Sequence, residues 1–216
     1  FCVIGALCAI STSADTLETV ERRMTASTAD EITPTLGHDG TNQVVVFNMS
    51  SNQYGREIWY QPLLSGTPSG MPVQVTTVAE SAANNDVFGD YIVYQALDYT
   101  SETWSLIAYQ ISTKTKFELA TASSIQDPKI YGTKVVWNGW REGLTIEYYD
   151  LNWLGYNMDP RVIASGGYIT DPDVGERFVV WKEFDSVYDT FDIYAYDFDF
   201  EMRFQVTDTS ETEGHP

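Results

Sequence analysis

Side chains able to carry out covalent chemistry are few in this 216-residue chain. The histidines are His38 and His215, and both cysteines, Cys2 and Cys8, lie in an apolar N-terminal segment. No Gly-x-Ser-x-Gly segment is present to hold a nucleophilic serine. The 31 acidic residues offer many carboxylate pairs of the kind that glycosidases use, but nothing in their spacing selects one pair. The sequence therefore predicts a non-catalytic protein.

A second group of polar residues recurs directly before a proline or the residue that replaces it, and we expect these residues at the mouth of a central channel; they are Asn84, Asp127, Asp171 and His215. Oxygen ligands of this kind suit a hard cation such as calcium, and an imidazole would extend the set to transition metals. Asp-Pro and His-Pro pairs also initiate turns, because an aspartate side chain can bond to nearby backbone N–H groups. A turn role is the simpler interpretation, and no other cofactor is expected.

The prolines that follow these residues belong to a repeat. Residues 127–137 (DPKIYGTKVVW) are echoed 44 positions later by residues 171–181 (DPDVGERFVVW), and Pro34 and Pro216 extend the series in both directions. A fixed period of this length is typical of chains that are built from stacked supersecondary units.

Three sequence landmarks recur in each of four units with nearly the same period. They are a β-branched run that ends in an aromatic residue, an alternating run and a short closing run; the aromatic residues are Phe47, Tyr94, Trp137 and Trp181. This composition is typical of strands, and turn residues separate the runs. With the stretch after each proline, they predict four strands per unit, which we name A to D. In the third unit these lie near 128–131, 133–138, 144–150 and 160–164. The proline is expected at the first residue of strand A, where its nitrogen need not donate a ladder hydrogen bond.

Four antiparallel strands per unit of this length are typical of a β-propeller blade. The phrase Asp-Pro-x-Ile-x-Gly-x-x-Val-Val-Trp, followed by Ile-Tyr-x-Tyr-Asp, resembles the TolB-like, WD40-like (PD40-type) propeller repeat of secreted and periplasmic bacterial and archaeal proteins. The matching residues in the third unit are Pro128, Ile130, Gly132, Val135, Val136, Trp137, Ile146, Tyr149 and Asp150. In the fourth unit they are Pro172, Val174, Gly175, Val179, Val180, Trp181, Ile193, Tyr194, Tyr196 and Asp197. The match is looser in the first two units, where Asn85 replaces the proline and Gln61-Pro62 replaces Tyr-Asp.

The expected fold is therefore all-β, a partial ring of a six- to eight-bladed propeller in a chain that is a fragment. The blades are expected at about 30–77, 78–122, 123–165 and 166–208, with a fifth beginning at 209–216. A complete four-bladed ring is the alternative.

The N-terminal residues predict export. Residues 1–14 combine an apolar stretch with small polar residues, as the remnant of a secretory signal peptide would, and residues 15–29 resemble a linker. A buried first element, or a lipoprotein site at Cys8, is the alternative. The apolar stretch is shorter than the about 20 residues that cross a bilayer, so no membrane span is expected in the mature chain. The expected location is extracytoplasmic: periplasmic, cell-surface or secreted.

The charge of the chain argues against a nucleic-acid partner. Its formal net charge is −19 and its 12 lysines and arginines form no basic stripe, so a duplex would be repelled. A hydrophobic content of 43% is enough for a packed core. The acidic surface is interpreted as a well-solvated one.

The loops between strands B and C are the expected binding surface. In a blade whose strand A lines the central channel, these loops share one end, which we call the upper face, with the connections from strand D to the next strand A. Aromatic faces among acids could stack a sugar or hold a peptide. The candidate residues are Tyr54, Arg56, Asp98, Tyr99, Trp104, Trp140, Arg141, Asp185 and Tyr188. Ordinary polar loops with aromatic side chains tucked between the blades are the alternative.

These observations together predict an exported, non-catalytic binding or scaffolding module for a protein or polysaccharide ligand. The resemblance also implies two enzymatic alternatives. Such propellers serve as the gating domain of prolyl-oligopeptidase-type serine proteases, and as metal-dependent polysaccharide lyases.

Overall fold

A computed structural model describes residues 30–38, 41–52, 55–209, 211–214 and 216. The expected signal remnant and linker at 1–29 lie outside the described residues, as do Tyr54 and His215. Within the described part of the chain, all regular elements are strands except for two short 3-10 turns, η1 (Val78–Glu80) and η2 (Leu151–Trp153).

The strands form four antiparallel sheets in chain order. Blade 1 contains β1 (Asp30–His38), β2 (Gln43–Asn52), β3 (Gly55–Leu64), β4 (Thr67–Pro68) and β5 (Val73–Gln74). Blade 2 contains β6 (Ala82–Phe88), β7 (Tyr91–Asp98), β8 (Thr103–Gln110) and β9 (Thr115–Ala122). Blade 3 contains β10 (Ile125–Tyr131), β11 (Lys134–Trp140), β12 (Leu144–Asp150) and β13 (Arg161–Gly166). Blade 4 contains β14 (Ile169–Val174), β15 (Phe178–Asp185), β16 (Thr190–Asp197) and β17 (Met202–Gln205).

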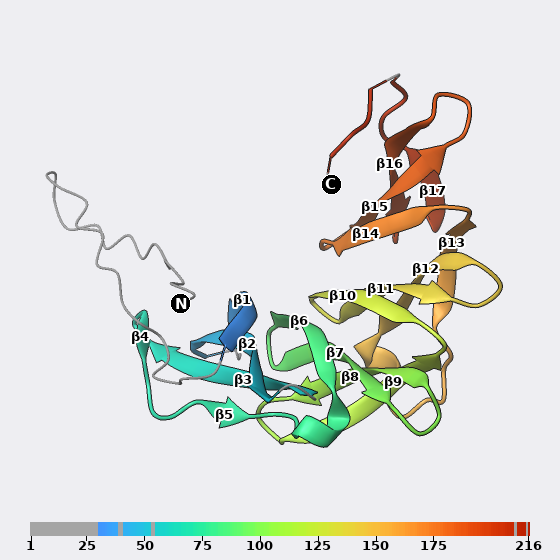
Figure 1. The fold of residues 1–216 in the computed structure, drawn as a ribbon. Coiled ribbons are helices and arrows are strands. Elements are labelled where there is room, and N and C mark those ends of the chain that lie inside the picture. Colours follow the sequence, from blue (N-terminus) through green and yellow to red (C-terminus); the bar gives the residue numbers. More distant parts are fainter. Residues whose placement is uncertain (1–29, 39–40, 53–54, 210, 215) are drawn as a thin grey trace, which may run out of the picture.

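Each blade is an up-and-down meander, and the outer strand of blade 1 is divided between β4 and β5, which both pair with β3. Figure 1 shows the four sheets side by side in an arc, with β1, β6, β10 and β14 on its inner side and the later strands of each blade outside. The predicted β-propeller fold and the four strands per unit are confirmed.

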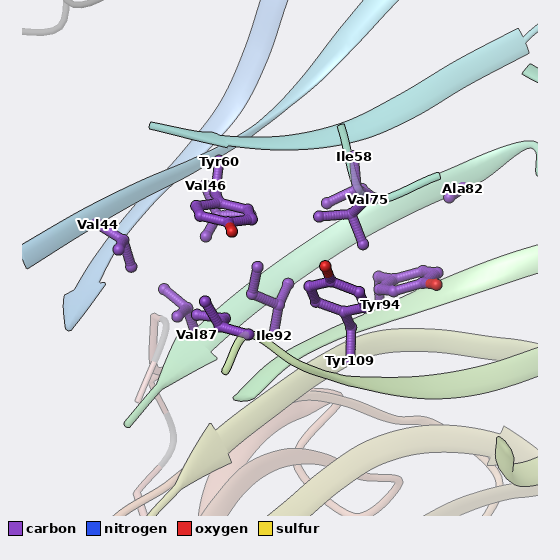
Figure 2. Packing of buried hydrophobic residues seen from close by; sticks show 11 residues of the cluster. Val44, Val46, Ile58, Tyr60, Val75, Ala82, Val87, Ile92, Tyr94 and Tyr109 are labelled. Atoms are coloured by element: carbon purple, nitrogen blue, oxygen red, sulfur yellow. The ribbon is translucent and has the colours of Figure 1, made fainter. Parts of the chain in front are cut away.

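Apolar side chains hold adjacent blades together face to face. Figure 2 shows the cluster between blades 1 and 2, where Val46 and Ile58 lie opposite Ile92 and Tyr109. Equivalent clusters join blade 2 to blade 3 and blade 3 to blade 4. Full burial of one such aliphatic side chain contributes about 1.5–3 kcal/mol. The β-branched runs of the sequence are thus the contact surfaces between blades.

The innermost strands correct one expectation, because their prolines do not begin the strand. In β10, Asp127 and Pro128 together lie opposite Trp137, since the register jumps from Gln126↔Asn138 to Lys129↔Val136. The same irregularity occurs in β1, β6 and β14. The proline is tolerated inside the strand because this β-bulge already interrupts the hydrogen-bond ladder.

The bulge also explains the polar residue before the proline. In all four blades it adopts a left-handed backbone; the residues are Thr33 (φ 48°), Asn84 (φ 47°), Asp127 (φ 48°) and Asp171 (φ 55°). Asparagine and aspartate enter this region far more readily than β-branched residues do. The repeated Asp-Pro pair is therefore the sequence signature of a bulge facing the aromatic residue of strand B.

The lower face, formed by the A–B turns and the C–D connections, is built alike in blades 2, 3 and 4. The first residue of each C–D connection donates its backbone N–H to a carbonyl in the A–B turn of the same blade. These bonds run from Ile111 to Asp90 (2.8 Å), from Leu151 to Thr133 (2.7 Å) and from Phe198 to Arg177 (3.0 Å).

Candidate functional site

The upper face brings the B–C loops together with the D–A connections. The Tyr99 hydroxyl in the B–C loop of blade 2 lies 2.8 Å from the Ser81 hydroxyl, which belongs to the connection between blades 1 and 2. In blade 4, Phe184 donates its backbone N–H to the carbonyl of Tyr168, from the preceding connection, at 2.9 Å. The two kinds of loop therefore form one surface.

Exposed aromatic rings from three successive blades lie on this face. Tyr99 of blade 2 is 61% exposed, Trp140 of blade 3 is 47% exposed and Tyr188 of blade 4 is 52% exposed. Large aromatic side chains normally lose most of their exposure in a folded chain, so a set of them on one face is a candidate binding surface.

Tyr168 joins this set and was missed by the sequence analysis. It is 66% exposed and lies in the connection from β13 to β14, and its ring contacts Phe184 with centroids 6.4 Å apart. The predicted binding residues all belong to the B–C loops, whereas Tyr168 does not. The D–A connections, although expected on the same face, contain the Gly166-Gly167-Tyr168 segment that could have pointed to it.

The remaining predicted residues of this face have structural partners or lie partly in the core. Trp104 is half-buried and packs against the cluster between blades 2 and 3. Arg141 makes two 2.9 Å hydrogen bonds to the buried carboxylate of Glu147. Asp98 and Asp185 accept backbone N–H groups within their own loops, from Thr100 at 2.8 Å and Val187 at 2.6 Å. Arg56 is exposed near the start of β3.

The guanidinium of Arg141 is held in an ion pair with Glu147, and the hydrogen bond to Glu147 raises the pKa of Arg141. A ligand that used this guanidinium would have to compete with Glu147. The predicted binding role of Arg141 stays a prediction.

The residues predicted at the channel mouth are divided among short polar contacts. Asn84 donates to the Gln95 carbonyl oxygen at 3.1 Å, and Asp171 pairs with Lys182 at 2.6 Å. Burial raises the pKa of Asp127, and the nearby charge of Asp171 raises it further. Among the described residues, no group of three or more His, Cys, Asp or Glu side chains is placed to hold a metal ion. A cation at the channel mouth stays a prediction.

Two further predictions concern membrane spans and export. None of the described segments is a helix long and apolar enough to cross a membrane. The export signal falls on residues outside the described ranges.

No family model and no curated protein sequence matches the chain. Solved structures resemble it at low sequence identity. TolB from Acinetobacter baumannii is 14% identical with a TM-score of 0.60, over 86% of this chain and 45% of that one. The β-propeller domain of the Trilobed protease from Pyrococcus furiosus is 10% identical with a TM-score of 0.61, over 84% of this chain and 58% of that one. Puromycin hydrolase is 11% identical with a TM-score of 0.62, over 87% of this chain and 31% of that one.

These similarities establish the fold. The expected resemblance to TolB-like propellers is confirmed at this level, and this chain spans about half the length of the TolB structure and less of the hydrolase. The set of similar structures includes both a TolB protein and propellers that belong to hydrolytic enzymes.

Proposed function

We propose that this propeller is an exported, non-catalytic binding module that holds its protein or polysaccharide ligand on the upper face. The observation that carries the proposal is the set of four exposed rings, Tyr99, Trp140, Tyr168 and Tyr188, contributed by loops from successive blades. Exposed aromatic rings supply large contact area at little cost in conformational entropy. The B–C and D–A loops differ between blades, so such a surface could be selective.

The net negative charge of the protein restricts the class of ligand that we expect. The chain carries 31 acidic against 12 basic residues, and the B–C loops add Asp98 and Asp185 beside the exposed rings. An anionic polysaccharide would be repelled by this field. We therefore expect a polypeptide segment rich in lysine or arginine, or a neutral glycan.

A binding experiment with three variants tests the proposal. The full chain, its Trp140→Ala/Tyr188→Ala variant and a Tyr156→Ala control would be applied to an array of neutral glycans and an array of basic peptides. Tyr156 is 76% exposed and lies in the C–D connection of blade 3, on the lower face, so it matches the target residues in exposure but not in place. Loss of about 1–3 kcal/mol of stacking energy per ring would reduce affinity at least tenfold.

The arrays separate the two ligand classes, since binding to only one of them identifies it. The double variant should lose the signal while the Tyr156→Ala control keeps it. Equal loss in both, or no loss in the double variant, would overturn the upper-face assignment.

Export is tested separately. The full-length chain expressed in a Gram-negative host should appear in the periplasm with its N-terminal residues removed, near position 14. Retention of an intact N-terminus in the cytoplasm would contradict export and leave the upper-face proposal unaffected.

A second candidate is that this propeller belongs to a serine peptidase. The similarity to puromycin hydrolase, over 87% of this chain and 31% of that one, favours it. The coding sequence that adjoins this segment decides between the two: a downstream α/β-hydrolase segment with a nucleophile elbow would favour the peptidase, and further blades followed by a stop would favour the binding module.

A further inference from the structure

Two carboxylates meet in the upper part of blade 4. Asp192 lies on β16 and is 0% exposed. Glu213 follows β17, and its backbone N–H donates to the carbonyl of Phe191 at 3.1 Å, which brings the returning chain alongside β16. The side chains of Asp192 and Glu213 are in direct contact.

Each carboxylate uses one oxygen and leaves the other without a partner. The Gln205 amide donates to Asp192 Oδ2 at 2.8 Å, and the Thr209 hydroxyl donates to Glu213 Oε1 at 2.7 Å. Asp192 Oδ1 and Glu213 Oε2 are buried and have no hydrogen-bond donor. Buried acceptors without a donor cost free energy, and charged ones cost most.

A third buried oxygen without a partner belongs to the same strand. Thr190 is 7% exposed and its buried hydroxyl has no hydrogen-bond partner. Because side chains two residues apart on a strand point to the same side, Thr190 and Asp192 share one face of β16. This part of blade 4 therefore contains three oxygens that are available as ligands of a cation.

The equivalent position in blade 1 shows how the fold satisfies a carboxylate without such a group. Glu57 stands where blade 4 has Asp192, and it is also buried. Gln74 donates to Glu57 Oε1 at 3.1 Å and the Trp59 indole donates to Oε2 at 3.1 Å. Blade 4 repeats the glutamine as Gln205 but has Tyr194 in place of Trp59, so the indole donor is lost and the other bond to Asp192 comes from the Thr209 backbone.

The basic side chains near blade 4 do not neutralise the pair. Lys182 is bound to Asp171 at 2.6 Å, and Arg203 is bound to Glu183 at 2.7 Å. Two adjacent buried carboxylates can remain ionised only if a positive charge lies between them; otherwise they share a proton.

We propose that Asp192, Glu213 and Thr190 form a site for a divalent hard cation of the calcium class. Two carboxylate oxygens and a hydroxyl are the ligands that such ions prefer, and water would complete the shell. The ion would tie the segment after β17 to β16. This site is independent of the ligand proposed for the aromatic surface.

Calcium titration of the full chain tests the site. After treatment with a chelator, the wild-type protein should bind one Ca²⁺ in isothermal titration calorimetry, with a Kd of about 10⁻⁴–10⁻³ M, as sites with few protein ligands do. At tenfold excess over Kd, Tm should rise by about 3–5 °C. Asp192→Asn should abolish both responses, and Thr190→Val should weaken affinity severalfold.

The Asp192→Asn variant is expected to fold, because it removes a buried charge and keeps the oxygen that Gln205 contacts. Glu57→Gln is the matched control and should bind Ca²⁺ like the wild type. Absence of binding in the wild type, or unchanged binding in Asp192→Asn, would overturn the proposal. The proposal would also be overturned if the wild-type Tm rose as the pH falls from 7 to 5 and did not change when Ca²⁺ is added. The two carboxylates would then share a proton.

Discussion

The aspartates near the two ends of β16 differ in the hydrogen-bond donors and charges that surround them. Asp197, at the lower end, accepts hydrogen bonds from the Arg177 guanidinium at 2.7–3.1 Å and from the Asp199 backbone at 2.9 Å. Asp192, in the upper half of the strand, accepts from the Gln205 amide and the Thr209 backbone but has a carboxylate as its neighbour. Arg177 lowers the pKa of Asp197, whereas burial raises the pKa of Asp192.

This difference extends to the faces as a whole. On the lower face the same backbone bond recurs in three blades, and polar side chains reinforce it, as with Asp90 and Ser112 in blade 2. In the upper part of blade 4, Asp192 and Glu213 each retain a carboxylate oxygen without a hydrogen-bond partner, whereas exposed rings occur on both faces. The lower face is committed to stability, and the upper face is the one on which we propose that a ligand binds.

The largest effect expected from this comparison is a loss of stability at the lower face. Leu151 is 6% exposed in the cluster between blades 2 and 3, and its backbone is fixed to Thr133. Leu151→Ala should lower the free energy of unfolding by about 2–4 kcal/mol because it leaves a cavity. Urea denaturation followed by far-UV circular dichroism measures this loss, and a change under 1 kcal/mol would show that this face is not tightly packed.

The two aspartates of β16 should give opposite pH dependences. The folded-state pKa of Asp197 lies below 3.8, so its contribution to stability is present above that pH and is lost as the pH falls through the folded value. The folded-state pKa of Asp192 lies above 3.8, so in the metal-free protein stability is lost as the pH rises through that value.

Measurements of Tm from pH 3 to pH 8 in the presence of a chelator check this contrast. Asp197→Asn should lower Tm at pH 7 and match the wild type most closely at pH 3. Asp192→Asn should raise Tm at pH 7 and have little effect at pH 3. If both variants changed Tm in the same direction at pH 7, the two ends of the strand would not differ in the way described.

A smaller gain is expected at the bulge of blade 1. Thr33 is a β-branched residue with φ 48°, whereas blades 2, 3 and 4 have asparagine or aspartate in this position. Thr33→Asn should therefore raise the free energy of unfolding by about 0.5–1 kcal/mol. The shift of the urea midpoint measures it, with Thr35→Asn as the control that lies outside the bulge; a destabilised Thr33→Asn protein would contradict the strain.

The smallest effect is expected at the exposed rings. Trp140 is 47% exposed, and its replacement by alanine should change the free energy of unfolding by less than about 0.5 kcal/mol. Urea denaturation beside Leu151→Ala gives the direct contrast. A loss as large as that of Leu151→Ala would mean that Trp140 supports the fold and is not free for a ligand.

Most strands could be predicted from the sequence, because a strand that packs against a neighbouring blade carries a β-branched or aromatic run; the division of the outer strand of blade 1 into β4 and β5 could not. The bulge could not be predicted, because the same Asp-Pro sequence is compatible with a proline that begins the strand and with a proline that follows a left-handed residue inside it. The contact between Asp192 and Glu213 was equally hidden. It depends on an irregular return of the chain after β17, which no local pattern encodes.

Only part of the candidate aromatic surface could be predicted from the sequence. Tyr99 and Tyr188 lie in polar loops and Trp140 ends β11 beside one, so their exposure follows from that setting, whereas Trp104 lies at the start of β8, where the strand turns it toward blade 3. Burial of a loop-end aromatic is decided by the neighbouring blade and not by its own segment.

The bulges of the inner strands also bear on how a chain of near-identical units avoids misassembly. A strand that slipped by one residue would bring the left-handed position onto Pro128 or Pro172, whose ring fixes φ near −65° and forbids it. Each unit that carries this proline thus rejects the neighbouring register on its own, whereas the second unit has Asn85 in its place. In a tandem array, strands of different blades could pair wrongly during folding. The Asp-Pro pair disfavours such mispairing locally, because it permits only one register of the inner strand.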